Sequence, residues 1–539
     1  MPKIAYFSAE YSVADSLPIY AGGLGILAGD AVMEAGDEGL DFHAFGLVYH
    51  KAFTAGDDDR RSIAERVVAE GFSRVAGTDG QPITWSVIAE GQTVAVGAWR
   101  KQYGQSSLTL LDTNVEGNSP EWQAVTDHLY DTLPDAMPRQ EVILGLGSVA
   151  LMELEGFEPD YYHLNEGHTS MVGLAVAMRY QRLHPELTLV EALAAVKLKL
   201  VATKHTIKHG GGLVLNRAAL DHMIGGNLST ARGSIDDLMA IGGKEDGYFF
   251  ATKFLLAIAC RANGVSEIHV RSEKAQYPES RLIAITNGVY DKRWRAVNLD
   301  GNPLKYSDQE LWAAHAANRC AMFDFVRAET GKQLHPERLT VVWARRMTGY
   351  KRPSLFINDL ERLRRLVENE QRPIQIVVAG HANPADAEGL EMENQITAAS
   401  KLPGLTAALA YLPHYNPSVA RTLVQGADLW LNTPLRGMEA CGTSGMKASL
   451  NGSLQFSTSD GWIDEVDAAP IGWILPEEAA EQAVYDIIER EIAPLFYNLN
   501  EVNLPVAWIV KMRANIELME RQFTSARMLK DYYQKLYTS

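Results

Sequence analysis

Short apolar runs separated by longer segments with helical periodicity recur along the whole chain. Each run has the length and the β-branched or aromatic content of a buried strand, and turn or loop residues follow it. The runs are KIAYFS, DFHAFGLVYH, DYYHLN, KLKLVATKH, LIAITNGV, LTVVWARR, IQIVVAG, ADLWLN and SLQFSTS. Strands that alternate with helices predict parallel sheets covered by helices, which is an α/β fold.

This rhythm is interrupted after TNGVYDKRW at 286–294, where a long helical pattern extends to about Thr330 and a second strand–helix series begins at Leu339. A chain of 539 residues is also too long for one hydrophobic core. We predict two doubly wound α/β domains with a ligand cleft between them, because such sheets bind ligands at the carboxyl ends of their strands. The predicted segments are an N-terminal domain over 1–295, a C-terminal domain over 296–500 and closing helices over 501–539.

The composition, with 46% hydrophobic and 22% charged residues, is that of an ordinary globular protein. No apolar run reaches the roughly 18 residues that span a bilayer, and the start MPKIAYFSAEYS lacks the features of a secretion signal. The net charge of −17 argues against a nucleic-acid binder, because duplex affinity comes largely from Lys and Arg. Three widely spaced cysteines fit a reducing compartment, so we expect a cytoplasmic protein.

A glycine-rich loop, IYAGGLGILAGD, occupies 19–30. It matches the relaxed dinucleotide-binding pattern only weakly, because the strand KIAYFS ends well before it. Gly22, Gly23 and Gly25 would let backbone N–H groups approach an anion at a helix N-terminus. The alternative is that the loop is only a tight turn.

Four cations follow the run LTVVWA directly: Arg345, Arg346, Lys351 and Arg352. Cations at the carboxyl end of a buried strand suit a dianion, since Arg offers a forked array of donors and Lys a compact charge. Surface salt bridges in an acidic protein are the alternative.

The stretch EACGTSGMKASLNG contains one lysine, Lys447. Two short matches to hydrolase motifs, S-x-x-K at 444–447 and HGGG at 209–212, lack the partner motifs that those hydrolases also need. The segment HLNEGH at 163–168 does not match the zinc motif H-E-x-x-H. Lys447 does follow a turn able to bind a phosphate, and an amine beside a phosphate site is what pyridoxal phosphate requires. A nucleotide-binding loop and a structural turn remain alternatives.

Taken together, nine segments resemble the α-glucan (glycogen, starch and maltodextrin) phosphorylases, particularly their shorter prokaryotic branch. In chain order they are SAEYSVADSLPIYAGGLGILAGD, YYHLNEGH, ATKHT, NGVSEIH, ITNGVYDKRW, ARRMTGYKRP, AGHANPAD, LVQGADLWLNTP and EACGTSGMKASLNG. The resemblance implies a two-domain GT-B fold with pyridoxal phosphate on Lys447. It also implies reversible phosphorolysis of α-1,4-glucans to α-glucose 1-phosphate with retention, and the cofactor's phosphate group would act as acid and base.

The resemblance further implies a role for individual residues. The cofactor phosphate would be held by Arg345, Thr443 and Ser444, with Tyr415 nearby. Inorganic phosphate would be held by Arg346, Lys351 and the amides of Gly22 and Gly23. The glucose 6-hydroxyl would be bound by His205 and Asn287, and the 3- and 4-hydroxyls by Glu439 and the backbone around Cys441 and Gly442. The remaining candidates are His168 and Asn165 on the cleft wall, and Asp460 as a residue that orients loops or a sugar-side water.

Two segments depart from the family pattern: KHTIKHGGGLV lacks the usual proline-containing loop, and AGHANPAD lacks a lysine. We therefore expect binding of the acceptor glucan to be the least family-like property, and little allosteric control in so short a chain. The oligomeric state stays open, a homo-oligomer included. A nucleotide-sugar glycosyltransferase, similar to glycogen or starch synthase, is the first alternative. Such enzymes do not need a Schiff-base lysine, so the presence of Lys447 counts against this alternative. A non-catalytic glucan-binding relative is the second, although it would be expected to have lost some of the candidate residues.

Overall fold

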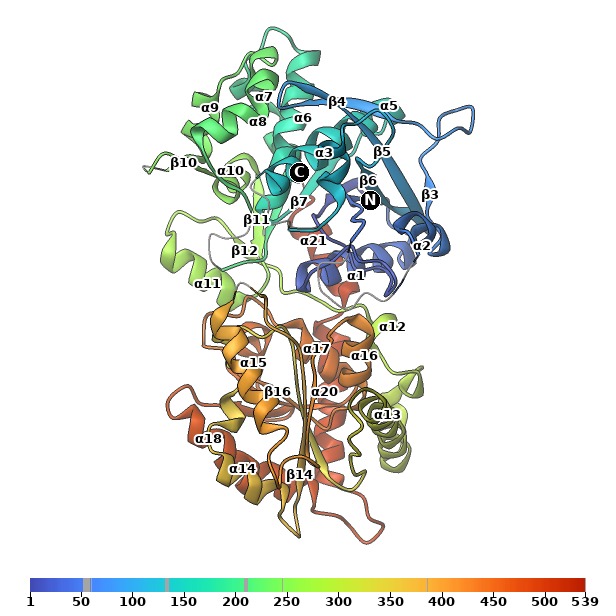
Figure 1. Cartoon of the computed structure of the whole chain (residues 1–539), viewed down its shortest axis with the longest axis vertical. Coiled ribbons are helices and arrows are strands. Elements are labelled where there is room, and N and C mark those ends of the chain that lie inside the picture. The colour runs from blue at the N-terminus through green and yellow to red at the C-terminus, as the bar shows by residue number, and fades with distance from the viewer. Residues whose placement is uncertain are drawn as a thin grey trace. The chain divides into compact units, whose positions relative to one another are not determined.

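The computed structural model describes residues 1–51, 59, 61–130, 135–207, 212–244, 246–384 and 386–538. The chain forms two compact units, each with its own sheet and hydrophobic core (Figure 1). The first unit consists of Met1–Val265, Glu273–Ile285 and Met528–Ser539, and the second of Ser266–Ser272 and Thr286–Arg527. Within the described ranges, none of the helices combines the length and the apolar character needed to cross a bilayer.

The first unit is built on a ten-stranded sheet in the order β12-β11-β8-β7-β1-β2-β6-β5-β3, with β4 paired to β5. The strands are β1 (Ile4–Phe7), β2 (Phe42–Leu47), β3 (Ser73–Arg74), β4 (Trp85–Ala89), β5 (Gln92–Tyr103), β6 (Ser106–Asp112), β7 (Tyr161–Asn165), β8 (Leu200–Lys204), β11 (Arg261–Gly264) and β12 (Ile283–Ala284). From β12 to β6 every pair is parallel, as the alternation of strands and helices predicts.

The other edge of this sheet differs from the prediction, because β3, β4, β5 and β6 pair in antiparallel fashion. Their connections are too short for a helix. Glu90 and Gly91 join β4 to β5 with φ values of 52° and 68°, the conformation of a two-residue hairpin turn. Gly104, with φ 58°, lies in the turn between β5 and β6. A hairpin turn returns the chain beside itself, so these strands cannot be parallel.

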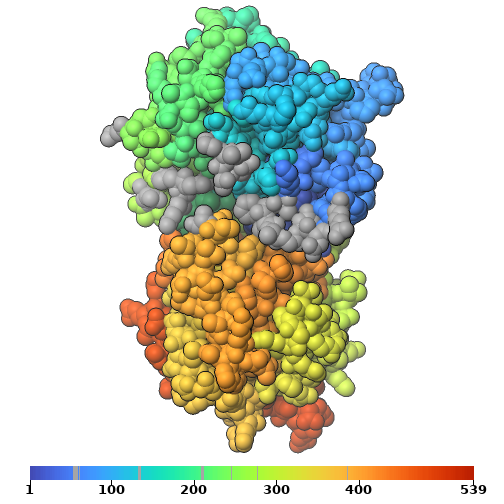
Figure 2. Space-filling model, viewed as in Figure 1, coloured from blue at the N-terminus to red at the C-terminus, as the bar shows by residue number. Residues whose placement is uncertain are grey.

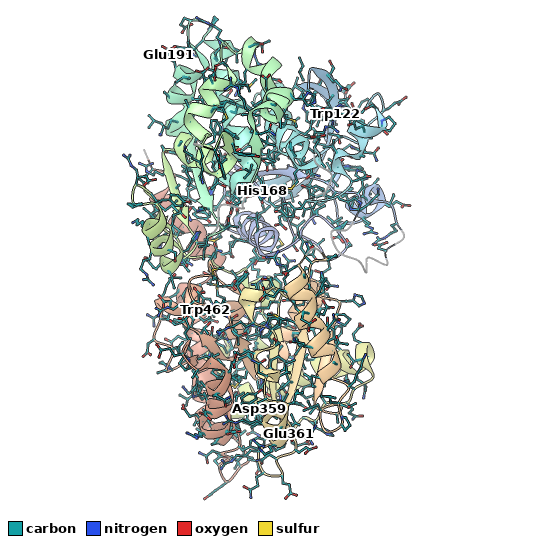
Figure 3. All side chains as sticks on the ribbon, turned by 60° about the vertical axis from the view of Figure 1, so that its left-hand side comes forward. Trp122, His168, Glu191, Asp359, Glu361 and Trp462 are labelled. Atoms are coloured by element: carbon teal, nitrogen blue, oxygen red, sulfur yellow. The ribbon has the colours of Figure 1, made fainter. Side chains whose placement is uncertain are left out.

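Helices and a small two-stranded sheet surround the main sheet of the first unit. The helices are α1 (Gly23–Asp37), α2 (Ile63–Ala69), α3 (Pro120–Gln123), α4 (Ala136–Val142), α5 (Ser148–Glu155), α6 (Ser170–Leu183), α7 (Leu189–Val196), α8 (Arg217–Thr230), α9 (Ile235–Gly242) and α10 (Ala251–Ile258). The small sheet is the antiparallel pair of β9 (Val214–Asn216) and β10 (Tyr248–Phe250). Capping side chains fix several helix starts. Thr188 and Glu191 form a reciprocal capping box at the start of α7 (Figure 3).

The end of the chain also belongs to the first unit. Helix α21 (Ser525–Lys535), red in Figure 1, lies among the blue and cyan elements, and Met528, Leu529 and Tyr532 are buried in the first core. The Tyr537 hydroxyl lies 2.5 Å from Nδ1 of His163 on β7. The first sheet is therefore covered by segments from both ends of the chain.

The second unit contains a six-stranded, fully parallel sheet in the order β15-β14-β13-β16-β17-β18. The strands are β13 (Leu339–Ala344), β14 (Ile374–Ala379), β15 (Leu409–Leu412), β16 (Leu429–Asn432), β17 (Leu454–Thr458) and β18 (Gly472–Leu475). The order grows outwards from β13, first to one side and then to the other, as in a Rossmann-like sheet. The predicted start of this series at Leu339 is confirmed.

Helices cover the second sheet, whose strands β13 and β14 are buried along their whole length. They are α12 (Asp291–Trp294), α13 (Asp308–Thr330), α14 (Leu360–Val367), α15 (Ala387–Ala399), α16 (Pro417–Gly426), α17 (Thr443–Leu450), α18 (Ala480–Ile487), α19 (Ala493–Phe496) and α20 (Val506–Gln522). In Figure 2 the yellow and orange atoms of this unit form the surface that hides the sheet. The predicted long helix up to Thr330 is confirmed as α13, which a Ser307–Glu310 capping box starts and Gly331, with φ 71°, ends. Helix α11 (Glu267–Gln276) contributes residues to both units.

Candidate active site

The order of the second sheet reverses between β13 and β16, and predicted site residues follow both strands. Arg345 comes directly after β13 and is buried. Its guanidinium donates from Nη1 to Oε2 of Glu439 at 3.0 Å and from Nη2 to Oγ of Ser444 at 2.8 Å. The structure thus brings Glu439, a candidate for binding hydroxyl groups, next to Arg345 and Ser444, two candidates for binding a phosphate.

Glu439 is the carboxylate of a buried ion-pair cluster. Nζ of Lys351 lies 3.1 Å from Oε2 of Glu439 and 3.4 Å from Oε1. Burial alone would raise the pKa of Glu439. The positive charges of Lys351 and Arg345 outweigh this effect and hold the pKa of Glu439 below its usual range, and the exposed Arg346 adds a smaller effect in the same direction. Glu439 is therefore ionised at neutral pH, and a concentrated positive charge surrounds it.

Helix α17 begins beside this cluster. Its first residues, Thr443 and Ser444, follow Gly442, which has a left-handed backbone with φ 81°. Lys447 is 5% exposed, and its Nζ lies 3.9 Å from the centre of the Trp294 ring. Residues three and four apart share a helix face, so Lys447 lies one turn from an anion site made by the helix N-terminus and Arg345. This arrangement fits a cofactor that carries both a phosphate and a carbonyl group.

Tyr415 lies near the same strand end. Its hydroxyl donates to the carbonyl oxygen of Ala344, the last residue of β13, at 3.2 Å. Burial raises the pKa of Tyr415 to about 12, so its hydroxyl stays protonated.

A short 3-10 helix, η9 (Gly461–Glu465), fixes the loop that carries Glu439 and Cys441. Asp460 precedes η9 and accepts from the amides of Met438 at 3.1 Å and Glu439 at 2.9 Å. The amide of Trp462, labelled in Figure 3, donates to the carbonyl oxygen of Cys441 at 2.9 Å. Burial raises the pKa of Asp460 to about 6. Asp460 therefore orients the loop that carries Glu439 and Cys441.

Asn287 lies in the same unit and is 6% exposed. Among the described residues, its side-chain oxygen has no hydrogen-bond partner. Cys441 is 4% exposed, and burial raises the pKa of its thiol, while the backbone of Asn287 acts in the opposite direction. A buried amide oxygen without a partner is costly unless a ligand satisfies it, which suits Asn287 to the recognition of a polar substrate.

The remaining candidates lie in the first unit, where β7 and β8 end. Asn165 is the last residue of β7, and its side chain donates to the carbonyl oxygen of Phe7 at 2.8 Å. The side-chain oxygen of Asn165 lies 3.2 Å from Nε2 of His205, which follows β8. Asn165 and His205 are therefore brought together.

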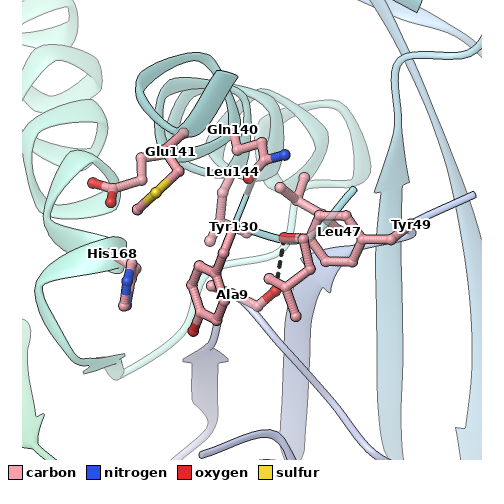
Figure 4. Close-up of a pocket in the computed structure, with 10 residues that line it drawn as sticks. Ala9, Leu47, Tyr49, Tyr130, Gln140, Glu141, Leu144 and His168 are labelled. Atoms are coloured by element: carbon pink, nitrogen blue, oxygen red, sulfur yellow. Dashed lines mark hydrogen bonds between the residues drawn. The ribbon is translucent and has the colours of Figure 1, made fainter. Parts of the chain in front are cut away.

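His168 lies on η3 (Gly167–Thr169) and lines a small pocket with Tyr130, Gln140 and Glu141 (Figure 4). Burial lowers the pKa of His168 to about 4, so the ring is neutral. Nδ1 of His168 has no hydrogen-bond partner in the part of the chain that the structure describes. The free space of about 10 Å³ is room for one water, which would satisfy this nitrogen.

At the glycine-rich loop, α1 begins at Gly23 after Gly22. A Cβ added at Gly22 or Gly23 would meet no atom within 4 Å, so an outside group can approach this backbone closely. The amides of Ala21 and Gly22 donate to Oε2 of Glu10 at 2.5 and 3.0 Å. The loop therefore does bind an anionic group, and in this structure that group is a carboxylate of the chain itself.

Comparison with known proteins connects these features to one family. The carbohydrate phosphorylase family matches residues 304–469. The glycogen phosphorylase of Aquifex aeolicus is 31% identical over 99% of this chain and 86% of the relative. The chain belongs to the α-glucan phosphorylase family. Two further relatives, the glycogen phosphorylase of Mycobacterium tuberculosis (32% identical) and the maltodextrin phosphorylase of Thermococcus litoralis (30% identical), match over 99% of this chain and 70% of their own length.

For this α-glucan phosphorylase family member, the sequence analysis missed two carboxylates that the structure places among the site residues. Glu10 binds the glycine-rich loop, and Glu166 lies between Asn165 and His168. Glu166 directly follows β7, and Glu10 is the third residue after β1. An acidic residue close to the carboxyl end of a buried strand is the signal that would have found them. Residues 208–211 of the segment KHTIKHGGGLV lie outside the described residues. Among the described residues, no three His, Cys, Asp or Glu side chains lie close enough together to bind a metal ion.

The close contact between η9 and the loop that carries Glu439 and Cys441 gives a first testable prediction. Gly461 has φ 60°, and a Cβ added there would lie 2.2 Å from the carbonyl oxygen of Cys441. We expect Gly461→Ala to lower the free energy of unfolding by roughly 2 to 5 kcal/mol, from backbone strain and overpacking together. Thermal unfolding measures this effect. In the control Gly226→Ala, inside α8, the new methyl group meets nothing within 4 Å and is expected to stabilise by about 0.5–1 kcal/mol.

Proposed function

We propose that this protein is an α-glucan phosphorylase, which cleaves α-1,4-glucans with inorganic phosphate and releases α-glucose 1-phosphate with retention. The observation that carries the proposal is the buried Lys447 on α17, one helical turn from the anion site of Arg345 and Ser444. The similarity to glycogen and maltodextrin phosphorylases over nearly the whole chain supports it. The relatives do not favour a nucleotide-sugar transferase.

The proposed cofactor is pyridoxal phosphate, held through its carbonyl carbon by Lys447 and through its phosphate by Arg345, Thr443, Ser444 and the first amides of α17. These donors fit the group, because a helix N-terminus and a guanidinium both favour a phosphate. Bound there, the cofactor supplies a phosphate with a second pKa of about 6, which can exchange a proton at neutral pH. Tyr415 is proposed to border this phosphate.

Inorganic phosphate is proposed to bind to Lys351, Arg346 and the amides of Gly22 and Gly23. Lys351 is paired with Glu439 in the structure, and Gly22 with Glu10. Because a carboxylate of the chain already accepts from each of these two donors, each can bind an anion, and a phosphate would compete with the carboxylate for it. Fixed cations that face the developing negative charge lower the barrier for attack on the glucosyl carbon.

Glucose recognition is proposed to fall to His205 and Asn287 at the 6-hydroxyl and to Glu439, with the backbone of Cys441 and Gly442, at the 3- and 4-hydroxyls. The side-chain oxygen of Asn287, which has no partner among the described residues, and the ionised Glu439 can both accept hydrogen bonds from hydroxyls. A sugar without the matching hydroxyl would leave the buried oxygen of Asn287 without a partner and Glu439 with only its ion pairs to Lys351 and Arg345, which costs binding energy. His168 and Asn165 would line the glucan path beside them.

We also propose that the two units are the domains of a GT-B fold, because the candidate residues are divided between them. The three cysteines are unpaired, which supports the proposed cytoplasmic location.

One experiment tests the activity and the cofactor together. Purified protein is incubated with maltoheptaose and phosphate, and α-glucose 1-phosphate is measured. We expect product, a near-ultraviolet absorption band, and a single borohydride-fixed peptide that contains Lys447. A colourless protein that is fully active with a sugar nucleotide would establish the transferase alternative instead, and binding of glucan without turnover would indicate a non-catalytic relative.

The departures from the family pattern give a prediction about chain length. We expect normal chemistry with an altered preference among maltotetraose, maltoheptaose and glycogen, because contacts distant from the reacting bond decide which glucan is held. The rate of α-glucose 1-phosphate release from each substrate measures this preference. Release from a differently linked glucan or a disaccharide, and from none of these three, would refute the substrate assignment while leaving the cofactor assignment intact.

A further inference from the structure

Glu166, the residue after β7, has a backbone conformation that is nearly reserved for glycine. Its φ is 65° and its ψ 166°, a region in which a side chain is strained. The side chain is also buried, with 1% exposure. A strained, buried acidic residue next to site residues is a reason to ask what its carboxylate does.

The carboxylate of Glu166 binds backbone amides of two segments, one that follows β7 and one that follows β8. Oε2 accepts from the amide of His205 at 2.9 Å, the amide of Thr206 at 2.9 Å and the hydroxyl of Thr206 at 3.1 Å. Oε1 accepts from the amide of Gly167 at 3.3 Å. Most of these bonds thus fix the first two residues after β8.

The backbone at Gly167, next to Glu166, also contacts the backbone of Gly212. A Cβ on Gly212 would lie 2.7 Å from Cα of Gly167, so the two backbones are in direct contact. The ring of His205 bonds to Asn165, the neighbour of Glu166. His205 is therefore held by two successive residues, through its ring by Asn165 and through its backbone by Glu166.

We propose that Glu166 is a positioning residue for His205, which fixes the backbone of His205 and Thr206 so that the imidazole meets the glucosyl hydroxyl in one orientation. The inference rests on the proposed function. The strain at Glu166 is matched in this arrangement by the bonds that its carboxylate accepts from the amides after β8.

Glu166→Gly tests the proposal because glycine relieves the strain while removing the carboxylate. We expect the variant to remain folded, because relief of the strain offsets part of the cost of the donors that lose the carboxylate. We expect its kcat to be about a hundredfold lower, since a displacement of about 1 Å costs that much. KM for phosphate is expected to change little. In Glu166→Gln an amide oxygen can still accept from His205 and Thr206, so we expect kcat within a few fold of the wild type.

Glu90→Gly is the matched control. Glu90 also has a positive φ, 52°, and a buried side chain, which pairs with Arg139 at 2.7 Å. It contacts none of the site residues named above, so the control is expected to keep wild-type kcat. If Glu166→Gly and Glu90→Gly lose activity only in proportion to lost stability, Glu166 has a merely structural role and the proposal is wrong.

Amide hydrogen exchange followed by mass spectrometry gives a readout that does not depend on activity. The peptide containing His205 and Thr206 is expected to exchange faster in Glu166→Gly than in the wild type, and at the wild-type rate in Glu166→Gln. Unchanged exchange in Glu166→Gly together with wild-type kcat would overturn the proposal. A wild-type protein without phosphorolysis would instead refute the proposed function, and the exchange rates would still decide whether Glu166 holds this backbone.

Discussion

Replacing Lys447 with alanine is expected to leave a folded protein that no longer retains pyridoxal phosphate and forms α-glucose 1-phosphate at least about 10²-fold more slowly. The loss follows because proton transfer by a positioned group contributes about 10²–10⁴-fold, and the cofactor phosphate depends on Lys447 for its place. Folding should persist, because alanine favours the helix and the lost contact with the Trp294 ring is worth only about 0.5–2 kcal/mol. Absorbance after dialysis and the phosphorolysis rate measure the two effects.

Lys447→Arg separates the charge of Lys447 from its reactivity. It keeps a cation near Trp294 but offers no primary amine, so we expect it to be as inactive as the alanine variant. Lys401→Ala, at an exposed position of the same unit, is expected to behave as the wild type. If Lys447→Ala retained bound cofactor and full activity, the cofactor site would lie elsewhere than at α17.

Replacing Lys351 with alanine is expected to lower kcat/KM for phosphate by about 10²–10³-fold, the typical cost of removing one donor aimed at developing charge. Stability should change less, because Glu439 keeps Arg345 as a partner at 3.0 Å. KM for the glucan should stay close to that of the wild type. Initial rates over a range of phosphate concentrations at saturating glucan measure the effect.

Arg346→Ala provides a comparison within the same segment. Arg346 is exposed, so its removal should weaken phosphate use with even less effect on folding. Lys351→Arg retains the charge with a different geometry and is expected to recover part of the rate. Wild-type phosphate dependence in both alanine variants would place the phosphate elsewhere.

The periodic parts of the fold were predictable from the sequence, because burial on both faces leaves a strong signal. The runs that became β13, β14 and β16 are mostly apolar segments, buried at every position. The run KLKLVATKH was predicted as one strand, but its first lysines form a 3-10 turn and only Leu200–Lys204 is extended. Strands β4 and β5 were missed because they alternate exposed and buried residues or carry polar ones.

The grouping of candidate residues was predictable where polar residues directly follow a strand. Arg345 after β13 and Asn165 at the end of β7 lie beside other predicted residues because parallel strands end at the same edge of a sheet. The partners of these groups could not be predicted. Glu10 binds the amide of a residue 12 positions away, and the carboxylate of Glu166 binds an amide 39 positions away. No local sequence pattern encodes either contact.

The placement of α21 has a consequence for how the protein is made. Met528, Leu529 and Tyr532 fill the core of the first unit, but they are synthesised after the second unit, Thr286–Arg527. At 5–20 residues per second, a stretch of about 240 residues takes roughly 10 to 50 s to translate. During that time the nascent first unit exposes the apolar surface that α21 will cover. The first unit therefore cannot complete its core until α21 has been made, and the surface that α21 covers is a target for chaperones until then.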